Sequence, residues 1–176
     1  PAKWTYANIE YMKNQLKQLA LAFHMHHDTH KHLPTGGWVF NWLGYPEYGY
    51  GKEQPGGWLY NILPYIEEEN IWLLPSDGDP ENITSEQKQG AKIMIETPIS
   101  VMNCPSRRKA QLFVGDGGHP GGSLWAYNAY DPDLGARSDY AACAGTTLQL
   151  VGDGATVSLE NGDSSNPSPP WRDPDV

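Results

Sequence analysis

The first part of the chain carries a regular apolar pattern. Apolar residues separated by steps of three and four form one stripe on a helix: Ile9, Met12, Leu16, Leu19 and Phe23. Polar residues fill most other positions, so the pattern predicts a helix from about Ala7 to Asp28 with this stripe buried. The helix must end before Leu33, because a residue that precedes proline is pushed out of the α region.

Glycine and proline decide the next segment. Residues 44–57 contain too many of both for a regular element and are predicted to form a loop. Residues 38–42, just before it, have the aromatic and β-branched content of a strand. Helical spacing returns over residues 58–66. Pro64 lacks an amide hydrogen, so it should kink this helix or begin a second short one.

The second half of the chain is predicted to hold one more helix and then short strands. Thr84, with Gln87 three residues later, is a capping-box pattern that should open a helix ending at Glu96. Turns then separate candidate strands at residues 99–103, 140–144, 147–151 and 155–160. This order indicates an α+β fold in which the long N-terminal helix packs on a small antiparallel sheet, with a helical, loop-rich insertion.

The composition fits one loop-rich domain. A chain of 176 residues can bury one core, and its 19 Gly, 15 Pro, 7 Trp and 10 Tyr suggest that aromatic rings cover irregular backbone. We expect a single domain over residues 1–165 and a flexible, proline-rich tail over residues 166–176. The formal net charge of −9 disfavours a nucleic-acid partner. No apolar run is long enough to span a bilayer.

Histidines gather at the end of the predicted first helix, between residues 24 and 32. His24, His27 and Asp28 share one helical face, and two imidazoles with a carboxylate could hold zinc. The structural interpretation is stronger, because His27 follows Phe23 by four residues and continues the apolar stripe. The others are expected to be exposed: His26, His30 and His32. We therefore predict no bound metal.

The sequence contains no recognisable catalytic arrangement. Glu67, Glu68 and Glu69 are adjacent, so they point in different directions and do not supply the carboxylate pair of a glycosidase. No Gly-x-Ser-x-Gly motif is present. Asp77-Gly78-Asp79 is similar to part of a calcium loop but lacks the later EF-hand ligands. A loop calcium site stays open, with Asp153, Glu160, Asp163 and Asp173 as candidate ligands. We expect no enzymatic activity and no cofactor.

Aromatic residues flank two of the predicted loops, and they are the feature with a plausible binding role. Exposed rings of this kind could stack on sugars; the candidates are Trp38, Trp42, Tyr48, Tyr50, Trp125 and Tyr127. The alternative is that the rings pack beneath the loops as small satellite cores. We favour packing, because these segments contain few aliphatic residues to cover the loops otherwise.

Several short strings along the chain carry a resemblance to a known family. They are Asn14-Gln15-Leu16-Lys17-Gln18, His24-Met25-His26-His27-Asp28, the stretch from Gln54-Pro55-Gly56-Gly57-Trp58 to Pro64-Tyr65-Ile66-Glu67, Thr97-Pro98-Ile99-Ser100-Val101, Cys104-Pro105-Ser106-Arg107-Arg108 and Asp139-Tyr140-Ala141-Ala142-Cys143-Ala144-Gly145. Their order and spacing resemble domain of unknown function 1559, a family of secreted bacterial proteins common in planctomycetes. Its members usually begin with a prepilin-type leader and membrane helix. The family has no established activity.

The resemblance implies a pilin-like fold and a place outside the cell. We expect an exported, extracellular or cell-surface ectodomain whose membrane-tethering N-terminal helix is absent from this chain. Export would make a disulfide between Cys104 and Cys143 favourable, the alternative being two buried thiols that never meet.

The function that follows is a non-catalytic structural or interaction protein, related to pilus or pseudopilin assemblies and to extracellular filaments. Its partners would be other copies of itself or pilin-like subunits. The alternative function is an extracellular glycan-binding module that uses the loop aromatics to hold polysaccharide.

Overall fold

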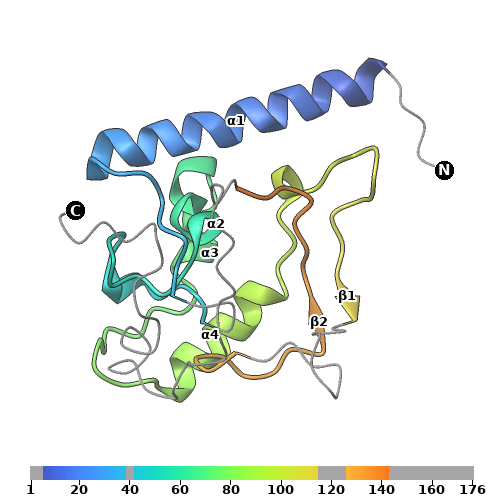
Figure 1. Ribbon diagram of the computed structural model, residues 1–176. Helices are drawn as coiled ribbons and strands as arrows, with labels where there is room; N and C mark the ends of the chain where they lie inside the picture. Colours follow the sequence, from blue (N-terminus) through green and yellow to red (C-terminus); the bar gives the residue numbers. More distant parts are fainter. Residues whose placement is uncertain (1–5, 39–41, 115–125, 143–176) are drawn as a thin grey trace.

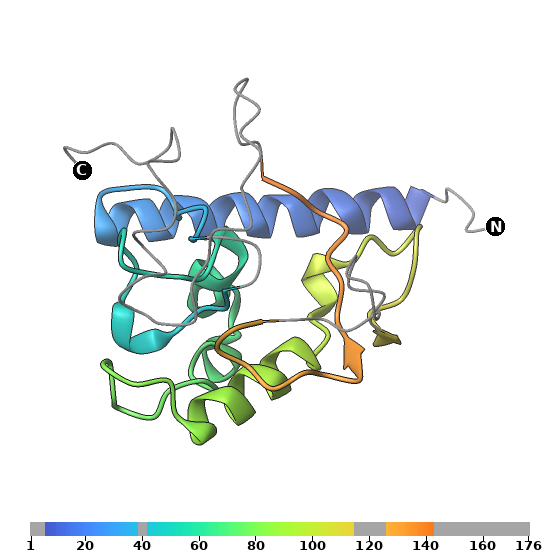
Figure 2. The same ribbon diagram turned by 60° about the horizontal axis from the view of Figure 1, so that its bottom comes forward.

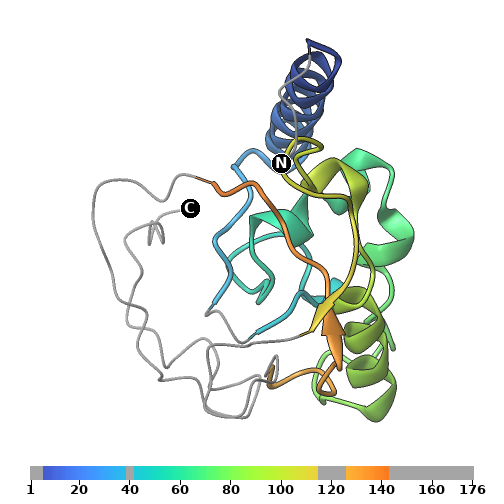
Figure 3. The same cartoon turned by 90° about the vertical axis from the view of Figure 1, so that its right-hand side faces the viewer.

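The computed structural model describes residues 6–38, 42–114 and 126–142. Its longest element is α1 (Tyr6–His30), which lies along one side of the body and stands out from it (Figures 1 and 3). Below α1 lie three short helices, α2 (Trp58–Asn61), η2 (Leu63–Ile66) and α3 (Glu69–Trp72). The predicted first helix is therefore present, with ends within two residues of those expected.

The buried face of α1 differs from the predicted stripe. The buried residues are Gln15, Leu19, Ala22 and His26, whereas Leu16 is 51 % exposed. Ile9, Met12 and Phe23 are half-buried, and His27 is exposed. The prediction was right for Leu19 and wrong for Leu16 and His27. Gln15 is buried because carbonyl groups of the body and the Tyr140 hydroxyl bind its amide. His26 is buried because its ring meets the His32 carbonyl and the rings of Tyr50 and Tyr65.

Apolar side chains of α1 meet the short helices beneath it. Leu19 and Ala22 pack with Ile62, at the start of η2, and with Met102 of η3 (Ser100–Met102). Phe23 lies over Trp58 of α2, with ring centroids 5.6 Å apart. This core joins the first helix to two segments that lie more than 30 residues further along the chain.

Proline and capping residues set the helix ends as the sequence predicts. Pro64 lies in the first turn of η2 and so separates it from α2. Thr84 caps α4 (Ser85–Ile95), because its hydroxyl accepts a hydrogen bond from the Gln87 N–H at 3.1 Å. Helix α4 lies on the far side of the body from α1 (Figures 1 and 2).

Helix α4 packs closely against the chain that precedes it. A Cβ placed on Gly90 would stand 1.8 Å from the carbonyl oxygen of Leu74. Only glycine allows the helix and the backbone at residues 74–75 to approach this closely.

The described sheet is small. Strands β1 (Phe113–Val114) and β2 (Leu134–Gly135) pair antiparallel, with Phe113 opposite Gly135. A long N-terminal helix, several short helices and a two-stranded antiparallel sheet confirm the α+β class.

Strand positions were predicted less well. The predicted strand at residues 99–103 is the 3₁₀ helix η3, in which the Met102 and Asn103 N–H groups donate to the carbonyls three residues earlier. Residues 140–142 form no strand either. The strands expected at residues 147–151 and 155–160, and the middle of the one expected at residues 38–42, lie outside the described residues.

The remaining described chain is largely loop. Residues 44–57 contain one 3₁₀ turn, η1 (Pro46–Tyr48). Within this loop the Gln54 side chain is fully buried: its amide donates to the Tyr45 carbonyl and accepts from the Tyr45 and Gly56 N–H groups. The side chain of Gln54 therefore ties the two ends of this loop together through the backbone of Tyr45 and Gly56.

Candidate functional site

The first group of candidate residues consists of the loop aromatics. Trp38 and Trp42 are 3 % and 4 % exposed and meet edge to face, with ring centroids 5.2 Å apart. Tyr45 completes this buried cluster, and Tyr48 and Tyr127 pack against it half-buried. Trp125 lies outside the described residues. Both rings pack beneath the loop, which is the arrangement favoured from the sequence, so Trp38 and Trp42 do not offer exposed ring faces to a sugar.

A polar turn fastens the aromatic loop to the start of α4. The Tyr45 hydroxyl donates to the Asp77 carboxylate at 2.6 Å, and the Thr84 hydroxyl donates to the other oxygen of Asp77. Burial alone would raise the pKa of Asp77, but the hydrogen bonds from Thr84 and Tyr45 outweigh it and lower that pKa. Asp79 accepts from the Glu81 and Asn82 N–H groups. The Asp77–Asp79 turn, which is similar to part of a calcium loop, thus uses these carboxylate oxygens to hold its own backbone. The candidate calcium ligands lie outside the described residues: Asp153, Glu160, Asp163 and Asp173.

A cluster of three histidines lies at the end of α1, and we call His26, His30 and His32 the histidine cluster. His26 is fully buried, which corrects the expectation that all three are exposed. The His26 ring lies 4.7 Å from that of His30 and 5.3 Å from that of His32. Burial, more than the neighbouring imidazoles, lowers the pKa of His26 to about 4.

Aromatic rings from the body surround the histidine cluster. His30 stacks on Tyr50 at 4.1 Å, and its Nε2 lies 2.8 Å from the hydroxyl of Tyr65. Tyr50 in turn stacks on Trp72 of α3, with ring planes 3° apart. Burial raises the pKa of Tyr50 to about 12, so this hydroxyl stays protonated at neutral pH. The stack joins the end of α1 to three segments of the body.

The residues proposed for zinc do not converge on one point. His24, His27 and Asp28 are exposed, and His27 Nδ1 lies 3.8 Å from the adjacent carboxylate of Asp28. Within residues 6–38, 42–114 and 126–142, no group of three or more histidine, cysteine, aspartate or glutamate side chains is arranged to hold a metal ion.

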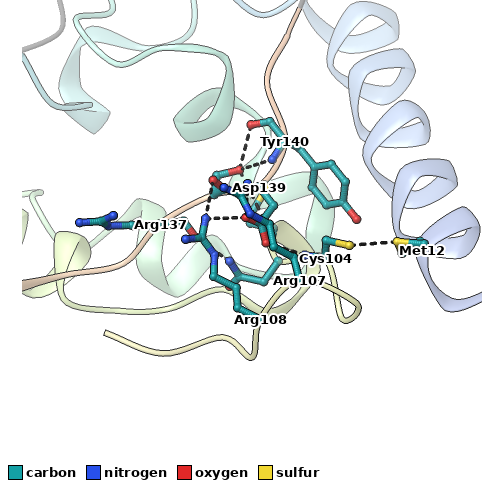
Figure 4. A network of polar contacts seen from close by, with 10 residues as sticks. Met12, Cys104, Arg107, Arg108, Arg137, Asp139 and Tyr140 are labelled. Carbon is teal, nitrogen blue, oxygen red and sulfur yellow. Dashed lines mark hydrogen bonds and ion pairs between the residues drawn. The ribbon is translucent and has the colours of Figure 1, made fainter. Parts of the chain in front are cut away.

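A polar network connects three of the strings that carry the family resemblance, and Figure 4 shows the part of it around Cys104, Asp139 and Tyr140. The Asp139 carboxylate, only 1 % exposed, accepts from the Cys104 N–H at 2.9 Å and pairs with Arg107 at 2.9 Å and Arg108 at 2.5 Å. Tyr140 follows Asp139, and its hydroxyl donates to Gln15 Oε1 of α1 at 3.1 Å. The network therefore runs from the Cys-Pro-Ser-Arg-Arg turn through Asp139 and Tyr140 to the first helix.

Gln15 is the contact of α1 in this network. Its amide Nε2 donates to the carbonyl oxygens of Ser100 and Asn103, at 3.0 and 3.1 Å. The Asn103 side chain then donates to the Arg137 carbonyl at 2.7 Å. The sequence patterns did not predict that Gln15, Arg108 and Asp139 form a network. The available signal was that all three stand within the strings of the resemblance.

Only one cysteine of the predicted disulfide, Cys104, lies within the described residues. Cys104 carries a free thiol whose Sγ lies 3.0 Å from Met12 Sδ on α1 (Figure 4). Cys143 lies outside the described residues, so the bridge stays a prediction.

A pocket of about 420 Å³ lies between the short helices and the end of α4. Its wall is mainly apolar and includes Trp42, Leu59, Leu63, Met94, Ile95 and Met102. Ser138 and Arg137 add polar groups. Such a pocket can hold an apolar molecule, but its described wall shows no pair of acid and base groups that would suggest a reaction.

The fold and these contacts define an α+β domain whose long first helix is fastened by a polar network and an aromatic cluster. The chain belongs to the family described as protein of unknown function (DUF1559), which it matches over residues 13–168. No curated protein and no solved structure matches the chain.

Proposed function

We propose that this domain is a non-catalytic interaction module of an exported, pilin-related surface protein, and that α1 provides its contact with other copies. The observation that carries the proposal is a second face of α1. Tyr11, Leu21 and Met25 are 51 %, 57 % and 42 % exposed. They fall on one side of the helix, in a row with the exposed polar residues Asn14 and Gln18 at steps of three and four.

This assembly face differs from the face that holds α1 to the body. The body-facing side contains Gln15, Leu19, Ala22 and His26, all buried. The assembly face is defined as Tyr11, Asn14, Gln18, Leu21 and Met25, all exposed, on a helix that stands out from the body (Figure 3). Apolar and amide side chains at helical spacing suit a second helix, on which the same row can pack.

Export and surface location rest on the family resemblance, and a tether would lie in a segment before α1. In the described residues, no helix is both long and apolar enough to cross a membrane. Glycan binding is the weaker candidate, because Trp38 and Trp42 are covered and cannot stack on a sugar without rearrangement.

The test is self-association of charge variants on α1. Leu21→Glu/Met25→Glu places two carboxylates on the assembly face, and sedimentation should then show a monomer over a concentration range in which the parent self-associates. Ala20→Glu/His24→Glu is the matched control, because both residues are exposed on another side of the same helix. A parent that stays monomeric, or a control that dissociates equally, would contradict the proposal.

A further inference from the structure

We propose that the histidine cluster forms an acid-sensitive contact that holds the last turn of α1 against the body at neutral pH and releases it in mild acid. The inference goes beyond the assembly role, since it concerns one chain and does not require a partner. It rests on the geometry of His26 and on the groups that surround it.

The first observation is the hydrogen bonding of His26. Its Nδ1 lies 3.0 Å from the carbonyl oxygen of His32. A carbonyl only accepts, so Nδ1 carries the proton and donates. The other nitrogen, Nε2, is buried and has no hydrogen-bond partner. The site therefore satisfies the one N–H of a neutral imidazole, whereas a second proton, added at Nε2, would meet no acceptor.

The second observation is the set of titratable groups around His26. His27 and His30 stand on α1 itself, and Lys31 and His32 follow in the next segment. From the body, Tyr50 of the loop and Tyr65 of η2 meet the His26 ring at 5.7 and 5.9 Å. The negative charge of Glu69, on α3, contributes to the raised pKa of Tyr50. The groups nearest to His26 are thus imidazoles and phenols, and a second positive charge among the imidazoles would add repulsion.

The third observation is the way the helix ends. Lys31 has a φ of 67°, in the left-handed region, and its N–H donates to the His27 carbonyl at 2.7 Å. A non-glycine residue in this conformation carries strain that its contacts must offset. The last turn of α1 therefore depends on the cluster contacts, and losing them allows this end to open before the rest of the helix.

Acid changes the balance in one direction. Burial lowers the pKa of His26, and that of His30, below the ordinary value for histidine. The opened segment then binds protons at a higher pH than the closed one, so opening becomes more favourable as the pH falls from about 6.5 toward 4. With a closed-state pKa of about 4, opening should increase roughly twentyfold between pH 7 and pH 5.

Amide hydrogen exchange tests this with the intact chain. The protection factor of the Lys31 N–H, corrected for the intrinsic pH dependence of exchange, should fall roughly tenfold or more from pH 7 to pH 5. The Lys88 N–H, which donates to Thr84 in the first turn of α4, is the internal reference and should change little.

Two variants assign the effect. His26→Gln removes the group with the larger pKa shift and should leave only the smaller fall in Lys31 protection that His30 contributes, whereas His27→Gln, at an exposed position, should keep the full fall. An unchanged pH dependence in His26→Gln, or a parent without any, would overturn the proposal. If His26→Gln does not fold, an NMR titration of the parent decides: a pKa of His26 near 6.5 would overturn it, and one below about 5 would support it.

Discussion

The carboxylate of Asp139 accepts a hydrogen bond from the backbone N–H of Cys104 at 2.9 Å, which joins two loop segments 35 residues apart. The same carboxylate pairs with Arg107 and Arg108. The carboxylate thereby fixes the turn at residues 104–108. Asn103, just before this turn, accepts a hydrogen bond from Gln15 of α1. This contact suggests that Asp139 stabilises the irregular half of the domain, where the described residues contain little sheet.

Asp139→Asn should lower the free energy of unfolding by about 2 kcal/mol, because the buried charge that the Cys104 N–H and Arg108 bind is lost. Urea unfolding followed by circular dichroism measures the change. Asp133→Asn, at an exposed aspartate, should change stability by no more than about 0.5 kcal/mol. Equal losses of unfolding free energy in both variants would show that the ion pairs of Asp139 add no more stability than an exposed aspartate does.

The same carboxylate predicts a loss of stability in acid. Burial alone would raise the pKa of Asp139, but the Cys104 N–H and Arg108 outweigh it, and that pKa lies below its usual value. Its stabilisation is therefore complete above the unfolded pKa, about 3.9, and is lost as the pH falls further through the folded pKa. Unfolding midpoints measured from pH 6 to pH 2 should fall less steeply in Asp139→Asn than in the parent. Parallel curves would contradict this assignment.

Gln15→Ala should destabilise the domain more than Leu16→Ala, although the second removes more apolar surface. Gln15 is 3 % exposed, and its loss leaves the Ser100 and Asn103 carbonyls without this donor, at a cost of about 2 kcal/mol. Leu16 is 51 % exposed, and its truncation should cost about 0.5 kcal/mol or less. Denaturant unfolding of the two variants gives the order directly, and the reverse order would mean that α1 buries the face predicted from its apolar spacing.

Trp42→Ala should cost about 3–5 kcal/mol, because it removes a buried ring that packs on Trp38 and Tyr127. Tyr130→Ala is a control at an aromatic residue that is 44 % exposed, and it should cost much less. Thermal unfolding measures both, together with retention of the folded proteins on polysaccharide. If folded Trp42→Ala keeps its stability but loses a retention that the parent shows, the glycan-binding alternative is correct.

Gly90→Ala should destabilise the packing of α4 by roughly 1–3 kcal/mol, because the new Cβ would overlap the Leu74 carbonyl. Gly51→Ala adds the same methyl group where no atom lies within 4 Å, and it should be nearly neutral. The melting temperatures of the pair give the comparison. A neutral Gly90→Ala would show that the backbone at residues 74–75 can move away without loss.

The sequence by itself determined where several helices begin and end. The spacing of apolar residues located α1 to within two residues, and Thr84 with Gln87 located the start of α4. Pro64 separated η2 from α2. These features are local: a cap or a proline acts on backbone groups within one turn, so neighbouring residues contain the information.

Only the tertiary structure decided which face of α1 is buried. Apolar residues lie on several sides of this helix, so spacing alone could not choose between Gln15 and Leu16 or between His26 and His27. For Gln15 the choice depends on carbonyls and a hydroxyl that stand 85 to 125 residues further along the chain. For His26 it depends on the His32 carbonyl and on the rings of Tyr50 and Tyr65. A buried polar side chain is stable only where such partners meet it, and sequence spacing does not show where distant partners lie.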